Sequence, residues 1–124
     1  MHLKNLEQQA KDNTNFRSVL ANGVHTQIVV MHINPGEDIG LETHPDNDQV
    51  LYLVSGKGEV VLNGEKREFN AGDAVLVPAG TEHNFTTLGD APMKIITTYS
   101  PPHHPVGTVH TTKADAEAAE ATHA

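Results

Sequence analysis

Short runs of apolar and β-branched residues, separated by turn residues, recur through the middle of the chain. Residues 25–33, HTQIVVMHI, form a nearly continuous apolar run, which predicts a strand buried on both faces. In residues 93–100, MKIITTYS, Lys94 should face water, so the odd-numbered side chains, Tyr99 among them, should face the interior. Six further strands are predicted, at residues 16–20, 49–55, 59–62, 65–69, 74–77 and 83–88.

Glycine, proline and asparagine separate these runs at short intervals. The Asn-Gly pair at 63–64 tolerates the positive φ angles of a tight hairpin turn. The NPG and PAG triplets at 34–36 and 78–80 end strands, because proline has no N–H to give a sheet. Short strands with turns about every eight to twelve residues predict an all-β sandwich or barrel. A parallel α/β sheet is excluded, since no helical patterns alternate with the strands.

The two ends of the chain differ in composition from its middle. Residues 1–14 form an N-terminal segment that predicts a short amphipathic helix. Residues 15–100 would form the barrel, and residues 101–124 a C-terminal tail that begins with a proline-rich, extended stretch. Within the tail, residues 113–121 have high helix propensity, and Thr112 is a candidate N-cap with an acidic residue in the first turn.

Composition narrows the possible partners. The 124 residues correspond to one domain, and with no cysteine, sulfur-ligated metal sites and disulfides are excluded. The net charge of -8 argues against a nucleic-acid partner. No apolar run approaches the roughly 20 residues of a membrane helix, and residues 1–13 lack a signal-peptide core. We therefore expect a cytoplasmic protein with neither a membrane nor a nucleic-acid partner.

Nine histidines are many for so short a chain, and two of them stand where strands should meet. Glu42 and His44 point the same way if their segment is extended, because side chains alternate along a strand. Gln49 begins the next strand, and His83 begins another after the turn at 78–80. Three adjacent strand ends can aim a carboxylate, two imidazoles and an amide oxygen at one point, a donor set for a divalent metal ion.

The spacing of these residues resembles the two sequence motifs of the cupin superfamily. The pattern G-x5-E-x-H-x4-Q-x6-G runs from Gly36 to Gly56, and G-x5-P-x-G-x2-H-x3-T runs from Gly72 to Thr87. The resemblance covers the central half of the chain. It implies a double-stranded β-helix, the jelly-roll barrel of cupins, with one metal ion among inward-facing strands. It also implies a homodimer.

Three positions depart from the family pattern. Glu42 stands where the family has histidine, Gln49 where it has glutamate, and Thr87 where it has asparagine. Glu42, His44 and His83 would then form a two-histidine, one-carboxylate set, the combination found in Fe(II) sites with open coordination positions. Mn, Ni and Zn remain alternatives to Fe. Gln49 would be a neutral fourth ligand or a hydrogen-bonding group that orients His44.

Other polar side chains are candidates for roles beside the metal. Tyr99 would be an acid, a base or a hydrogen-bond donor, or else a structural residue at a strand end. Glu42 could abstract a proton where it is not fully engaged as a ligand. His103 and His104 are surface residues by default; the alternative is that the tail folds over the barrel mouth and brings them to the pocket.

Three functions are compatible with this pattern. The preferred one is a metal-dependent enzyme of isomerase, lyase or dioxygenase type that acts on a small polar molecule. The second is a non-catalytic domain that binds or senses a small ligand. The third is a metal-free scaffold, which Gln49 in place of a carboxylate would favour.

Overall fold

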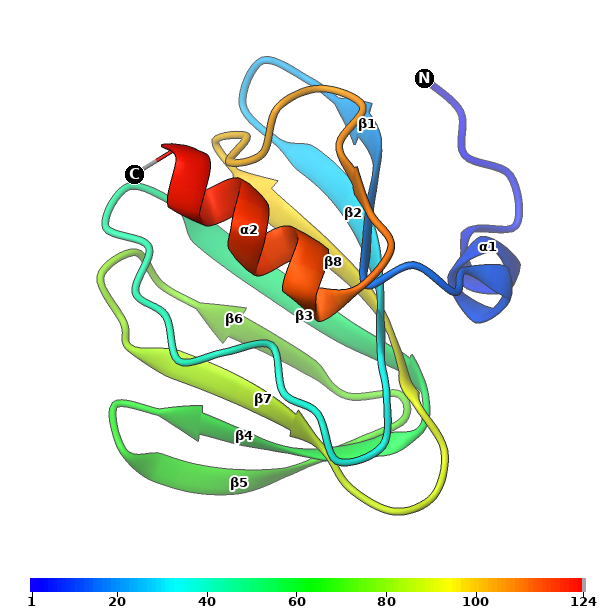
Figure 1. Cartoon of the computed structure of the whole chain (residues 1–124), viewed down its shortest axis with the longest axis vertical. Coiled ribbons are helices and arrows are strands. Elements are labelled where there is room, and N and C mark those ends of the chain that lie inside the picture. Colours follow the sequence, from blue (N-terminus) through cyan, green and yellow to red (C-terminus); the bar gives the residue numbers. More distant parts are fainter. Residues whose placement is uncertain (124) are drawn as a thin grey trace.

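The computed structural model describes the backbone of residues 1–123 and the side chains of residues 1–120 (Figure 1). Its regular elements, in chain order, are α1 (Leu6–Asp12), β1 (Arg17–Asn22), β2 (Gln27–Ile33), β3 (Asp48–Ser55), β4 (Lys57–Leu62), β5 (Glu65–Asn70), β6 (Ala74–Val77), β7 (His83–Thr87), β8 (Met93–Ser100), β9 (Val109–His110) and α2 (Lys113–His123). The predicted strands agree with the observed ones to within two residues at each end.

The strands form two antiparallel sheets. The larger has the order β6-β3-β8-β2-β1-β9, and the smaller has the order β5-β4-β7. Apolar side chains of both sheets meet in the core between them, Leu51 and Ile95 from the larger sheet and Phe69 and Phe85 from the smaller among them. Strand β8 alternates buried and half-buried residues along its whole length, as predicted. The all-β jelly-roll barrel is therefore confirmed.

Two local differences from the predicted strands have simple causes. Strand β2 begins at Gln27 and not at residue 25, because the amide of Gly23 binds the carbonyl of Thr26 at 2.7 Å and closes a turn there. Strand β9 was not predicted. Its two residues lie in the proline-rich tail and pair with Arg17 and Ser18 of β1. His110 and its partner Arg17 are 93 positions apart in the sequence.

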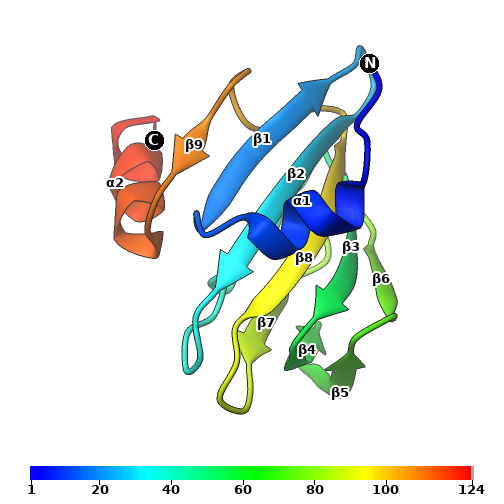
Figure 2. The same cartoon turned by 90° about the vertical axis from the view of Figure 1, so that its right-hand side faces the viewer.

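The helices lie on different sides of the barrel (Figure 2). Helix α1 packs on the outer face of the larger sheet, where Ala10 is buried and Asn13 accepts a hydrogen bond from Lys94 at 2.6 Å. His32 contacts the same Lys94 and Asn34, so it is a packing residue of this outer face. Over the described residues, neither helix is both long enough and apolar enough to cross a membrane.

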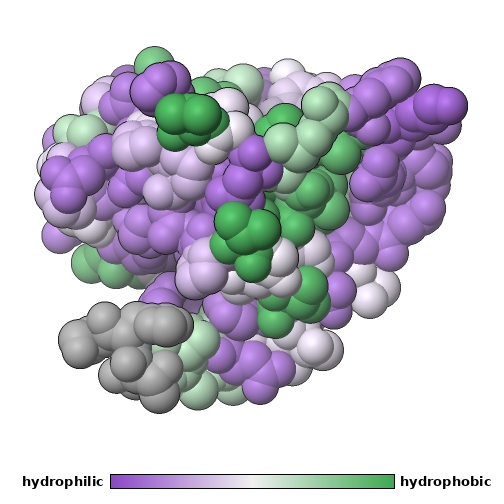
Figure 3. Space-filling model, turned by 90° about the horizontal axis from the view of Figure 1, so that it is seen from above, coloured by the Kyte–Doolittle hydropathy of each residue, from purple (hydrophilic) through white to green (hydrophobic). Residues whose placement is uncertain are grey.

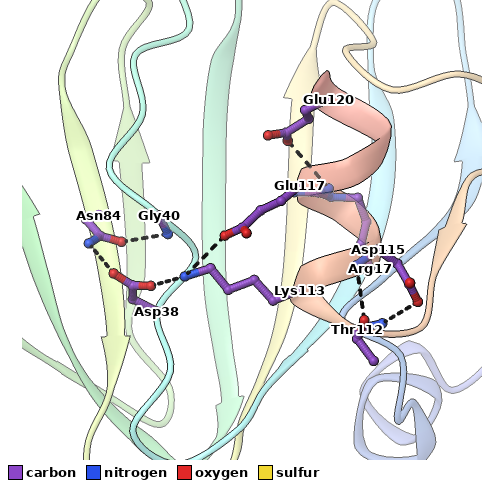
Figure 4. A network of polar contacts seen from close by, with 9 residues as sticks. All are labelled: Arg17, Asp38, Gly40, Asn84, Thr112, Lys113, Asp115, Glu117 and Glu120. Atoms are coloured by element: carbon purple, nitrogen blue, oxygen red, sulfur yellow. Dashed lines mark hydrogen bonds and ion pairs between the residues drawn. The ribbon is translucent and has the colours of Figure 1, made fainter. Parts of the chain in front are cut away.

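Helix α2 begins with the predicted cap. The hydroxyl of Thr112 accepts from the Asp115 amide at 3.1 Å, and the Asp115 carboxylate accepts from the Thr112 amide at 3.3 Å. The Lys113 ammonium then pairs with Asp38 on the segment between β2 and β3 (Figure 4). Hydrogen bonding from Asn84, and then Lys113, holds the pKa of Asp38 below its usual value. Helix α2 thus bridges the two sides of the barrel opening.

The end of the molecule seen in Figure 3 mixes hydrophobic and hydrophilic residues. Val24 and Val106 are each 82% exposed, and Val106 shares a shallow groove with Met1, Val19 and Leu20. Scattered apolar side chains are ordinary on protein surfaces. These exposed apolar side chains therefore do not identify a binding partner.

The motif glycine Gly56 lies where the backbone allows no side chain. Its φ is +97°, and an added Cβ would lie 2.4 Å from the carbonyl oxygen of Pro92. Gly72 has a similar φ of +94° but open space around it. Alanine at either position should cost about 1–3 kcal/mol for the left-handed backbone. Only Gly56→Ala adds a clash, which should cost about another 1–3 kcal/mol.

Urea denaturation of the two variants measures this difference directly. We expect the unfolding free energy of Gly56→Ala to be lower than that of Gly72→Ala by about 1–3 kcal/mol, the cost of the clash. Equal losses of unfolding free energy would contradict the close approach between Gly56 and Pro92.

Candidate functional site

The site begins with a backbone pair between two distant segments. The amide of Glu42 donates to the carbonyl of His83 at 2.9 Å, and the amide of His83 donates to the carbonyl of Glu42 at 2.9 Å. Residues paired in this way lie directly opposite, with their side chains on the same face. His44 lies two positions beyond Glu42, so it returns to that face. Its Nε2 is 3.3 Å from Oε2 of Glu42, and its ring centroid is 5.2 Å from that of His83.

His83 presents one free ring nitrogen to this site. Its Nδ1 lies 2.8 Å from the carbonyl oxygen of Thr81. A carbonyl only accepts hydrogen bonds, so Nδ1 is the donor and Nε2 is the nitrogen left to bind a ligand. Second partners of this kind are what fix the tautomer and orientation of metal-binding histidines.

Gln49 contributes a buried oxygen without a partner. Its side chain is 2% exposed, and its Nε2 donates to the Thr97 hydroxyl at 3.1 Å. Its Oε1 accepts no hydrogen bond from the described residues. A buried unsatisfied acceptor costs about 1–3 kcal/mol, so it usually marks a missing ligand or water. Because the amide group bonds to Thr97, the predicted alternative of orienting His44 has no contact here to support it.

Tyr99 connects Gln49 to the histidines. It lies opposite Gln49 in the pairing of β3 with β8, is 2% exposed, and its ring centroid is 5.8 Å from that of His44. Burial raises the pKa of Tyr99 to about 12, an effect that the charge of Arg17 opposes. The phenol is therefore protonated near neutral pH and can act as a hydrogen-bond donor.

Burial also sets the protonation of the other groups. It lowers the pKa of His44 to about 4, with smaller contributions from the neighbouring His103 and His83. It raises the pKa of Glu42 to about 7, and the nearby Glu120 adds to this effect. His44 is therefore the neutral imidazole that metals bind. Glu42 can gain or lose a proton near neutral pH, as a general acid or base does.

A metal ion needs several donor atoms of suitable type within reach of one point. Among the described side chains, no three His, Cys, Asp or Glu residues are gathered tightly enough to form a ready-made metal cluster. Glu42, His44 and His83 are nevertheless neighbours, one ring nitrogen of His83 is free, and the buried oxygen of Gln49 lacks a partner. Two imidazoles, a carboxylate and an amide oxygen suit a first-row divalent ion, so the residues fit the group.

The tail brings two more histidines to the site. The ring of His103 lies 4.5 Å from that of His44 and stacks on Tyr99 at 5.5 Å, although His103 keeps one side exposed. The ring of His104 is half-buried and lies 4.9 Å from Tyr99. Burial lowers the pKa of His104 to about 2. The tail therefore folds over the barrel mouth, as in the alternative interpretation, with His104 half-buried and His103 still exposed.

Gln27 makes the hydrogen bonds that hold the His103–His104 stretch of the tail in this position. Gln27 is fully buried; its Oε1 accepts from the amides of His103 and His104 at 3.2 and 3.1 Å, and its Nε2 donates to the His104 carbonyl at 2.7 Å. Asn47 adds a bond of 2.5 Å to the Pro101 carbonyl. The sequence analysis missed Gln27, although a polar residue inside an apolar strand was a signal that it bonds to something.

Arg17 is the second residue that the sequence analysis missed. Its side chain is 2% exposed, its Nη1 lies 3.2 Å from Nδ1 of His110, and the same atom is 3.9 Å from Glu120 of α2 (Figure 4). A lone arginine in a short first strand gave little reason to expect burial, since charged side chains are rarely buried without a partner.

Comparison with known proteins identifies the family to which this fold belongs. Residues 29–99 match the family described as the cupin domain. This chain belongs to the cupin family. Cupins commonly hold a divalent metal and small ligands inside the barrel, the region in which Glu42, His44, Gln49 and His83 lie in this chain. The jelly-roll architecture expected from the two motifs is thereby confirmed for this cupin.

Two similar proteins cover almost all of this cupin. An uncharacterised protein of Bacillus subtilis, YrkC, is 45% identical over 122 residues, which are 94% of this chain and 66% of YrkC. The crystal structure of BH2720 from Bacillus halodurans is 43% identical, with a TM-score of 0.93, and the match covers 94% of this chain and 93% of that one. Neither name states an activity.

A third match has a name that states a reaction. Quercetin 2,3-dioxygenase of Bacillus subtilis is 33% identical over 72 residues, which are 55% of this cupin but only 21% of the dioxygenase. The family therefore includes enzymes, and the relationship by itself carries no reaction to this chain.

Replacing Gln27 by leucine tests how the tail is held. Leucine has a similar volume but makes none of the three hydrogen bonds, so the tail should open locally. We expect amide hydrogen exchange at His103 and His104 to be at least tenfold faster than in the parent protein. The amides of β4 and β5, which do not contact the tail, should keep their rates. Unchanged exchange at His103 and His104 would contradict the anchoring role.

Proposed function

We propose that this cupin binds one divalent metal ion through Glu42, His44 and His83, with the Gln49 amide oxygen as a weaker fourth ligand. The observation that supports it most directly is the buried oxygen of Gln49, which has no partner among the described residues and lies at a site that also holds a carboxyl group and two imidazoles. Fe, Mn, Ni and Zn all accept such a set.

We further propose that the site is that of an enzyme acting on a small polar molecule. A bound ion of this kind polarises a carbonyl or carboxylate oxygen of its ligand. Glu42, with a pKa of about 7, accepts or returns a proton where it is not fully engaged as a ligand. Tyr99 keeps its proton and donates a hydrogen bond to developing negative charge. Isomerisation and elimination use these functions, and Fe(II) would add dioxygenation.

The second candidate is a non-catalytic cupin that binds a small ligand. Gln49 favours it, because a neutral amide where the family has glutamate removes one negative charge from the metal site. Ligand-induced thermal stabilisation without turnover, with and without oxygen, would select this function over the enzymatic one.

Elemental analysis and metal titration test the primary proposal. Protein purified without an affinity tag should contain a transition metal, and the chelator-stripped protein should take up one ion per chain with a rise in Tm. Glu42→Gln and His83→Ala should each lower the affinity by about tenfold or more, since each removes a donor group. His25→Ala, which removes an exposed histidine, is the matched control and should leave the affinity unchanged.

A fourth variant separates a direct role of Gln49 from a merely structural one. Gln49→Glu restores a carboxylate, and the Thr97 hydroxyl can rotate to donate to it, so metal affinity should rise. No uptake by the parent protein, or equal losses in Glu42→Gln and His25→Ala, would contradict the proposed site.

A further inference from the structure

The buried guanidinium of Arg17 lacks a close counter-ion. The side chain is 2% exposed, and its Nε has no hydrogen-bond partner among the described residues. Its nearest carboxylate contact there is Glu120 at 3.9 Å, which is too long for a hydrogen bond, and the Glu120 side chain is 56% exposed. Buried charges are normally paired and hydrogen-bonded, because removing them from water is costly. This site therefore has unused capacity for an anion.

The groups around Arg17 supply little negative charge of their own. Nη1 of Arg17 lies 3.2 Å from Nδ1 of His110, an imidazole that brings no negative charge. The rings of His103 and His104 lie against Tyr99, with ring centroids 5.5 and 4.9 Å from that of the phenol. None of these side chains is a carboxylate that could balance the charge of Arg17.

We propose that Arg17 binds the carboxylate of a small organic acid at the barrel mouth, and that Glu120 takes the place of that carboxylate in the free protein. The inference rests on the proposed function, since other oxygens of the acid would face Glu42, His44 and His83. A guanidinium presents two parallel N–H groups that match the two oxygens of a carboxylate. The long contact with Glu120 is a weaker version of that interaction.

The attachment of α2 allows Glu120 to be displaced. Of the described residues of this helix, Ala116 alone is buried. The ion pair of Lys113 with Asp38 ties the first turn of the helix to the barrel, at the end of α2 away from Glu120 (Figure 4). The end that carries Glu120 can therefore move while the first turn stays attached. The helix acts as a cover whose charged tip competes with the ligand.

Glycolate and its neutral amide, glycolamide, are suitable probes, because they differ mainly in charge. Chemical-shift titration of the metal-stripped protein at constant ionic strength measures millimolar binding. The parent protein should prefer glycolate by roughly tenfold, and Arg17→Gln should remove that preference. Glu120→Gln should tighten glycolate binding by about threefold or more, since the competing carboxylate is gone.

The matched control is Glu117→Gln, which removes another exposed carboxylate from the same helix, one that contacts Lys113 and not Arg17. It should leave glycolate affinity unchanged. Should Arg17→Gln fail to fold, the comparison of Glu120→Gln with Glu117→Gln still decides, because both side chains are exposed. Equal affinities of these two variants, or no preference for glycolate in the parent protein, would overturn the inference.

The result is independent of the metal proposal. The titration uses stripped protein, so a chain that binds no metal can still show the preference for glycolate. Conversely, metal uptake through Glu42 and His83 without that preference would leave the metal site standing and reject the role of Arg17 alone.

Discussion

The antiparallel pairing of Glu42 with His83 is the contact on which the site depends. It attaches the segment between β2 and β3, which has little regular structure of its own, to the first residue of β7. Two backbone hydrogen bonds then bring a carboxylate and two imidazoles from distant parts of the chain to one face of the barrel. Other backbone hydrogen bonds, such as that from the Gly80 amide to the His44 carbonyl at 2.9 Å, attach the same segment, but this pair sets Glu42 directly opposite His83.

Exclusion of water is the second requirement, and the tail supplies much of it. Gln27 anchors the stretch that carries His103 and His104, and α2 extends from the β1 edge to Asp38 across the opening. Under this cover, burial lowers the pKa of His44 and raises the pKa of Glu42. The same burial leaves Arg17 as a fixed positive charge. Metal binding, proton transfer and anion binding would all draw on this one enclosed environment.

The sequence predicted the features that depend on local pattern or spacing. The alternation in β8 placed Tyr99 inside, and the motif spacing brought Glu42, His44 and His83 together. It missed interactions that arise only when distant segments meet. Gln27 binds amides 76 and 77 positions away, and Arg17 contacts a tail strand 93 positions away. Hydrophobic periodicity carries no information about such polar contacts.

The central claim is that Glu42, His44 and His83 hold a single ion in the barrel. Anomalous diffraction from a crystal of the metal-loaded protein, recorded at the absorption edge of that metal, tests it most directly. The predicted result is one peak about 2.0–2.2 Å from the carboxylate of Glu42 and from one ring nitrogen of each histidine. A peak held by other side chains, such as His103 and His104, with Glu42 and His83 unbound, would contradict it.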